Sequence, residues 1–152
     1  MTDAPGNSIT ARGFDAAQFM HYASRFGHGA ALGIDYLAHG YDWTELVLPY
    51  GEHLIADLET RVIASGAIVS LMDMATSMAI WVKRDSFAPQ ATVDLRIDYL
   101  RPARPAQSII GRGECYRITR NIAFVRGVAH DGDPADPLAH VAGTFISTGS
   151  WI

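Results

Sequence analysis

The longest helical pattern in the chain lies at residues 64–83, which read ASGAIVSLMDMATSMAIWVK. Apolar residues recur three and four positions apart along it, at Ile68, Leu71, Met72, Ala75, Met78, Ala79 and Val82. This spacing places them on one broad face of an α-helix. Because a face that apolar must be covered, the pattern predicts a buried helix packed against a sheet.

Strand patterns follow this helix. Residues 91–101 alternate strictly between apolar and polar side chains, which is typical of a β-strand. We expect further strands at residues 107–119, 121–131 and 138–148, with a turn at 130–134. The sheet is therefore expected to hold four strands after the long helix.

The segment ahead of the long helix is shorter and more broken. Residues 1–13 are expected to form a flexible tail, and residues 14–152 a single domain. A short amphipathic helix is predicted from Asp15 until Gly27 and Gly29 stop it. One bent strand or two strands should follow up to Leu48. The order of elements predicts an α+β protein, with an antiparallel sheet wrapped around one long central helix.

Composition excludes several classes of protein. The 152 residues are 49% hydrophobic, enough for one sizeable core. A net charge of -4 without a basic stripe argues against a nucleic-acid partner. The one cysteine, Cys115, cannot form an intramolecular disulfide, and no signal-peptide core or long uninterrupted apolar stretch is found. We therefore expect a cytoplasmic protein without a membrane partner.

Several strong site motifs are missing. The sequence has no phosphate-binding loop of the Walker A type and no G-x-S-x-G elbow. Its six histidines, at positions 21, 28, 39, 53, 130 and 140, lack the spacing and the cysteine companions of a zinc site. No metal site is predicted.

One carboxylate, Asp73, stands inside the apolar helix. An uncompensated buried charge is costly, so its position needs a reason. It could serve a hydrolase as general base or nucleophile, or it could be held by neighbouring hydrogen bonds or by a subunit contact. Gly66, Ser70 and Ser77 lie on the same offset face of the helix.

The start of the helix offers a second candidate feature. The first backbone N–H groups of a helix are free, and with the positive end of the helix dipole they can polarise a carbonyl oxygen. Ser65 and Gly66 are small enough to let a substrate approach these amides. Alternatively, Ser65 merely caps the helix.

Two stretches, SGAIVSLMDMA at residues 65–75 and ATVDLRIDYLRP at residues 91–102, resemble PaaI-like hotdog acyl-CoA thioesterases. The resemblance covers roughly residues 33–146. It implies a hotdog fold, dimers that join two sheets edge to edge and often pair again into tetramers, and active sites at the dimer interface. It also implies a glycine amide that polarises the thioester carbonyl and an Asp of the partner subunit that acts as base or nucleophile.

Asp73 falls on the acidic position of this family, and Ala64-Ser65-Gly66 stands where the family has His-Gly-Gly. The resemblance therefore assigns catalysis to Asp73 and to the amide of Ser65 or Gly66. Ser70 and Ser77 are expected to line the acyl pocket. The cations available for the phosphates of coenzyme A are Arg101, Arg104 and Arg120.

The sequence thus predicts an acyl-CoA thioesterase acting on a small or medium acyl group, aryl groups included. No resident cofactor is expected, since coenzyme A is part of the substrate. The alternative is a non-catalytic hotdog protein that binds an acyl-CoA-like ligand, which the missing histidine favours. A hotdog dehydratase or hydratase ranks last, because no histidine lies near Asp73 in the sequence.

Overall fold

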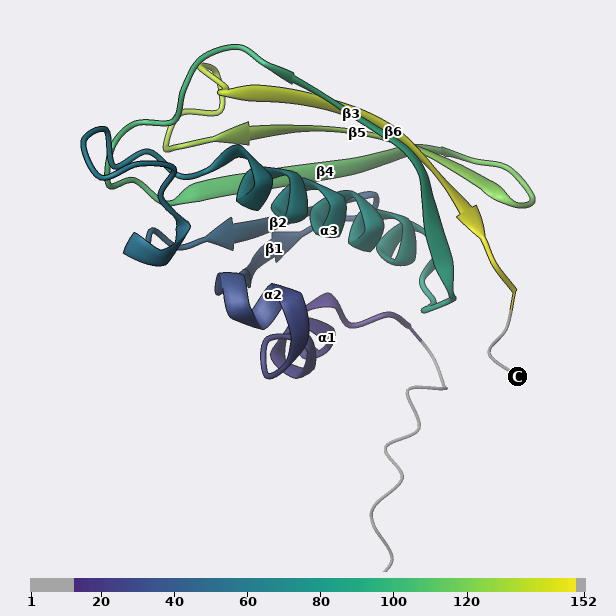
Figure 1. The fold of residues 1–152 in the computed structure, drawn as a ribbon. Coiled ribbons are helices and arrows are strands. Elements are labelled where there is room, and N and C mark those ends of the chain that lie inside the picture. The colour runs from purple at the N-terminus through teal and green to yellow at the C-terminus, as the bar shows by residue number, and fades with distance from the viewer. Residues whose placement is uncertain (1–12, 150–152) are drawn as a thin grey trace, which may run out of the picture.

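The computed structural model describes residues 13–149, which form one six-stranded antiparallel sheet around a long helix (Figure 1). The helices are α1 (Ala16–Ala23), α2 (Gly27–Leu32), the short 3-10 helix η1 (Glu52–Leu54) and α3 (Ser65–Arg84). The strands are β1 (Asp35–His39), β2 (Trp43–Leu48), β3 (Gln90–Tyr99), β4 (Ile109–Ile118), β5 (Ile122–His130) and β6 (Ala139–Ser147). Their order in the sheet is β1-β2-β4-β5-β6-β3, and this arrangement confirms the predicted fold class.

The core lies between α3 and the sheet that curves around it (Figure 1). The face of α3 that was predicted from the 3,4 spacing is buried, with Leu71, Met72 and Ala75 fully covered. By length and composition alone α3 could also cross a membrane. Because its apolar face is buried against the sheet, we interpret it as the core helix of a globular fold.

Helix and sheet lie in close contact at Gly113 of β4. A Cβ added there would lie 2.6 Å from the carbonyl oxygen of Ala75. The Thr44 hydroxyl of β2 donates to the same carbonyl oxygen at 2.7 Å. Only a residue without a side chain lets the backbone of β4 lie this close to α3, so Gly113 fixes the position of α3 on the sheet.

The N-terminal region differs in part from the prediction. Asp15 caps α1 by accepting from the Gln18 N–H at 2.9 Å, as expected. The helix ends at Ala23, however, and Gly27 begins α2 instead of ending a helix, so the predicted single helix is wrong. Phe26 is extended between the two, which turns the chain. Most of the predicted flexible tail, residues 1–12, lies outside the described residues.

Strand β3 forms an edge of the sheet among residues 13–149, paired with β6 on one side only. Two of its apolar side chains, Val93 and Tyr99, are 60% and 46% exposed. The alternation predicted this strand correctly. An edge strand has a neighbour on one side only, so in a single chain its apolar side chains are poorly covered.

The glycine contact gives a test of the packing. Gly113→Ala should lower the free energy of unfolding by about 1–3 kcal/mol, because the added methyl group collides with backbone that cannot move aside. Chemical denaturation measures this. Gly66→Ala is the matched control: a Cβ there meets nothing within 4 Å, so stability should not fall. Equal stability of the Gly113 variant and the wild type would contradict the close approach.

Candidate active site

The first turn of α3 presents free backbone donors. Ala64 is the cap residue and makes no side-chain hydrogen bond to the helix, so the alternative that Ser65 caps it is wrong. Since the first N–H groups of a helix lack intrahelical partners, the amides of Ser65 and Gly66 can bind an anionic oxygen. Both residues are exposed.

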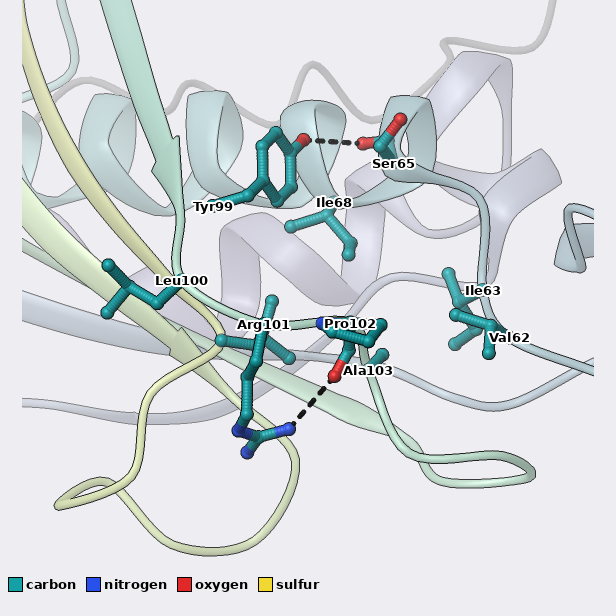
Figure 2. A pocket seen from close by; sticks show the side chains of 10 residues that line it. Val62, Ile63, Ser65, Ile68, Tyr99, Leu100, Arg101, Pro102 and Ala103 are labelled. Atoms are coloured by element: carbon teal, nitrogen blue, oxygen red, sulfur yellow. Dashed lines mark hydrogen bonds between the residues drawn. The ribbon is translucent and has the colours of Figure 1, made fainter. Parts of the chain in front are cut away.

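A cavity of about 410 Å³ opens beside this helix start (Figure 2). Its wall comes from the segment before α3, the first turns of α3, and the end of β3 with the loop after it. The lining residues are Val62, Ile63, Ser65, Ile68, Tyr99, Leu100, Arg101, Pro102, Ala103 and Leu138. Most of these side chains are apolar, which is usual for a site that binds a small organic group.

Tyr99 joins the end of β3 to the start of α3. Its hydroxyl donates to the Ser65 carbonyl oxygen at 3.2 Å (Figure 2). Burial raises the pKa of this phenol, although the bond to Ser65 offsets part of the effect. The hydroxyl therefore stays protonated at neutral pH and closes one side of the cavity.

The predicted phosphate-binding cations Arg101 and Arg104 are paired with carboxylates. Arg101 donates to both oxygens of Asp131, at 2.7 and 3.0 Å, and its Nε lies 3.3 Å from Asp136. Arg104 reaches Asp131 at 3.3 Å and Asp136 at 3.1 Å. The Asp131 side chain is fully buried. These four residues, named here the Arg–Asp cluster, tie the loop after β3 to the loop after β5.

Arg120 is not brought to the cavity within one chain. It lies in the exposed turn between β4 and β5, which the strand register places beside Ser147 and the Gln90 end of β3. The cavity lies at the Tyr99 end of the same strand. The two are at opposite ends of the sheet.

Asp73 lies on the outward face of α3, half-buried and turned toward β3. Its Oδ1 accepts a hydrogen bond from the Thr92 hydroxyl at 2.8 Å. The carboxylate lies on the offset face of the helix, away from the broad apolar face, and the neighbouring Thr92 hydroxyl compensates part of its burial. Thr92 orients the carboxylate and leaves it open to solvent or a ligand.

Ser70 and Ser77 share this outward face and do not line the cavity. The Ser70 hydroxyl lies 2.8 Å from His28 Nε2 of α2 and 3.2 Å from the Gly66 carbonyl oxygen, to which it donates. The Ser77 carbonyl oxygen accepts from Gln90 at 2.9 Å. In the single chain both serines help to hold α3 to its neighbours.

The two candidate catalytic features are far apart within one chain. Gly66 and Asp73 are separated by seven positions on α3, which is roughly 10 Å along the helix axis. A reacting carbonyl group must lie about 3 Å from both the oxyanion donors and the attacking group. Within one chain the free amides and the Asp73 carboxylate therefore lie in two different places.

Sequence reasoning missed three polar residues that the structure brings to these features. Thr92 and Tyr99 belong to a strand whose alternation was recognised, but alternation gives no hydrogen-bond partner. His28 was considered only as a metal ligand. Within residues 13–149, no three histidine, cysteine, aspartate or glutamate side chains are grouped to hold a metal ion.

A hotdog fold with free helix amides, an apolar cavity and a carboxylate on the central helix defines a thioesterase-like protein. The chain belongs to the thioesterase superfamily, whose family model matches residues 62–137. The predicted membership of a thioesterase family is thereby confirmed, and the PaaI protein shares the predicted hotdog fold. No curated protein matches the chain.

Solved structures share the fold. A Pseudomonas aeruginosa protein is 37% identical with a TM-score of 0.76, over 85% of this chain and 96% of that one. A Haemophilus influenzae thioesterase is 18% identical with a TM-score of 0.78, over 91% of this chain and 94% of that one. The Escherichia coli PaaI protein, from the phenylacetic acid degradation operon, is 15% identical with a TM-score of 0.73, over 88% and 94%.

The Arg–Asp cluster predicts a dependence of stability on pH. Hydrogen bonds from Arg101 are the main reason that the pKa of Asp131 falls from 3.8 to about 2. A carboxyl group whose pKa is lowered by folding stabilises the protein above its unfolded pKa, and this contribution disappears as the pH falls through the folded pKa. For Asp131 the window runs from about pH 4 down to about pH 2.

Asp131→Asn should therefore lower the free energy of unfolding at pH 7 by about 2 kcal/mol. The difference from the wild type should shrink as the pH is lowered toward 2. Urea denaturation at pH 7, 4 and 2 measures both. A difference that is the same at all three pH values would show that the Asp131 carboxylate does not stabilise the fold through its charge.

Proposed function

We propose that this protein hydrolyses an acyl-CoA thioester to a free acid and coenzyme A. The acyl group is small or medium in size, aryl groups included. One observation carries the proposal: the Asp73 carboxylate, held by Thr92 at 2.8 Å, stands on the helix whose free N-terminal amides border the apolar cavity. Membership of the thioesterase superfamily supports the same reaction.

The amides of Ser65 and Gly66 stabilise the oxygen of the reacting carbonyl. As a nucleophile adds to the thioester carbon, that oxygen becomes an anion, and preorganised N–H donors together with the helix dipole lower its energy. Backbone donors do not depend on the side chain, so the replacement of His-Gly-Gly by Ala64-Ser65-Gly66 leaves them in place. Ser65 and Gly66 therefore act as the oxyanion site.

Asp73 acts as general base. Its carboxylate takes a proton from a water molecule as the water oxygen bonds to the thioester carbon, and the carbon–sulfur bond then breaks to release coenzyme A as the thiol. The Thr92 hydroxyl occupies one carboxylate oxygen and leaves the other for the water. Direct attack by the carboxylate on the thioester carbon would give an anhydride, which water then hydrolyses.

A homodimer completes the site. Within one chain, donors and base are too far apart for one carbonyl group, and the exposed edge of β3 offers a surface for a second copy. Antiparallel pairing of two β3 strands about a two-fold axis places the Thr92 end of one beside the Tyr99 end of the other. Asp73 of each chain then serves the cavity of its partner.

The working protein is thus a soluble, cytoplasmic dimer or dimer of dimers, with acyl-CoA as its small-molecule partner. Coenzyme A enters as part of the substrate, and the reaction uses water as its only co-reactant. Arg120 remains a candidate for the coenzyme A phosphates, since its guanidinium is in an exposed turn. Arg101 and Arg104 are weaker candidates, because carboxylates already pair with them.

The second candidate function is binding of an acyl-CoA-like ligand without turnover. Ala64 favours it, because the histidine that the family places before the glycines is missing. Under this alternative the cavity and the amides hold the ligand, and Asp73 has only its structural bond to Thr92.

Release of free thiol from a panel of aryl and aliphatic acyl-CoAs separates the two functions. The wild type should hydrolyse at least one of them, and Asp73→Asn should lower kcat by about 10²–10⁴-fold, because the amide of Asn cannot accept the proton of water. Asp42→Asn, the same change in the turn between β1 and β2, should keep full activity. Binding without turnover across the panel would favour the second function, and full activity of the Asp73 variant would remove Asp73 from the mechanism.

A further inference from the structure

The cavity wall contains one charged side chain among the residues that line it, that of Arg101. In Figure 2 its guanidinium points away from Ser65 and the helix start, so that the aliphatic stem borders the cavity. The guanidinium bonds to both oxygens of Asp131, at 2.7 and 3.0 Å, and to the Pro102 and Asp136 carbonyl oxygens at 3.1 and 2.8 Å. Both terminal nitrogens are therefore engaged outside the cavity, and Nε, which is buried and makes no hydrogen bond within the described residues, lies 3.3 Å from the Asp136 carboxylate.

The surrounding charges balance. Arg101 and Arg104 face the carboxylates of Asp131 and Asp136, two positive charges against two negative ones. The fully buried Asp131 side chain holds Arg101 in a fixed fork geometry, which resists reorientation toward a ligand. Arg101 thus contributes no free positive charge to the cavity.

The remaining polar groups of the wall are few. The Tyr99 hydroxyl donates to the Ser65 carbonyl oxygen at 3.2 Å. The Ser65 side chain lies at the mouth, beside the amides that the thioester carbonyl needs. Most of the other lining side chains are aliphatic, among them Val62, Ile68 and Leu138.

We propose that this cavity holds the acyl group of the substrate and selects uncharged, apolar acyl chains, excluding those that end in a carboxylate. The inference rests on the proposed function and adds the substrate class to it. Transfer of an apolar acyl chain from water to this apolar wall lowers the free energy of binding. A terminal carboxylate would lose its hydration and find no free cation in return, which is a large penalty.

The Arg–Asp cluster is then the specificity determinant. If Asp131 loses its charge, the Arg101 guanidinium loses its main counter-charge and the bidentate pair that holds it away from the cavity. The side chain can then turn toward the cavity and pair with a terminal carboxylate of a substrate. Neutral acyl chains gain nothing from the change, so their binding should be almost unaffected.

Two analogues that cannot be hydrolysed test the selection directly. S-hexyl-CoA and S-(5-carboxypentyl)-CoA have equal chain lengths and differ only in the terminal group. Calorimetry should find the carboxylated analogue at least about 100-fold weaker, because its charge is buried unpaired. Affinities within threefold of each other, or no binding of either analogue, would overturn the proposal.

Asp131→Asn should reduce the affinity difference between the two analogues by about tenfold or more, because the carboxylated analogue should bind this variant more tightly. Asp136→Asn, at an exposed position, should also reduce the affinity difference between the two analogues. This variant replaces Asp131→Asn if the latter does not fold. Glu114→Gln is the matched control: it frees Arg126 from a bidentate pair on the face of the sheet turned away from α3, and discrimination should not change. Unchanged discrimination in both aspartate variants would show that the Arg–Asp cluster does not set it.

Turnover tests the proposed function separately. Hexanoyl-CoA should be hydrolysed with a kcat/KM at least about 100-fold above that of adipyl-CoA, which carries the terminal carboxylate. If neither thioester is hydrolysed but the analogues still differ in affinity, the thioesterase function fails and the selection stands. If adipyl-CoA is hydrolysed as well as hexanoyl-CoA, the function stands and the selection fails.

Discussion

The structure depends on the burial of one apolar helix face against the curved sheet. Gly113 lets the backbone of β4 come against Ala75, and the Thr44 hydroxyl bonds to the same carbonyl. This contact sets the distance between α3 and the sheet and the direction of the helix. Because a helix is stiff, both its outward face and its N-terminus are then fixed in space, and these are the two places where the candidate chemistry lies.

The same rigidity separates the two halves of the site. The amides at the start of α3 and the Asp73 carboxylate are roughly 10 Å apart along the axis. No side-chain rotation within the chain can bring them to one carbonyl group. The exposed edge of β3 lies next to both halves, since Tyr99 bonds to Ser65 at one end and Thr92 bonds to Asp73 at the other. In the proposed dimer a second copy at this edge relates the halves by symmetry, so under this proposal assembly and catalysis depend on the same strand.

Much of the fold, and the superfamily, could be predicted from the sequence. The 3,4 pattern predicted residues 64–83 as helix, and α3 spans Ser65–Arg84. Strict alternation located β3, and the motifs around Asp73 identified the superfamily. The sequence could not show that Arg101 pairs with Asp131, thirty positions away, because ion-pair partners leave no periodic signal. The sequence also could not show α2. Its six residues are too few for a helical pattern, and it begins at Gly27, although glycine more often ends a helix.

The central claim is that one active site uses the amide of one chain and the carboxylate of its partner. Gly66→Pro removes one of the two amide donors in the first turn of α3, where the lost N–H breaks no intrahelical bond, and Asp73→Asn removes the base. Each variant alone should lose about 10²-fold or more of the wild-type activity. Co-expressed, they should form hybrid dimers with one intact site, and activity should return to about a quarter of the wild-type level for random pairing. Failure to recover activity in purified hybrid dimers would contradict a shared site.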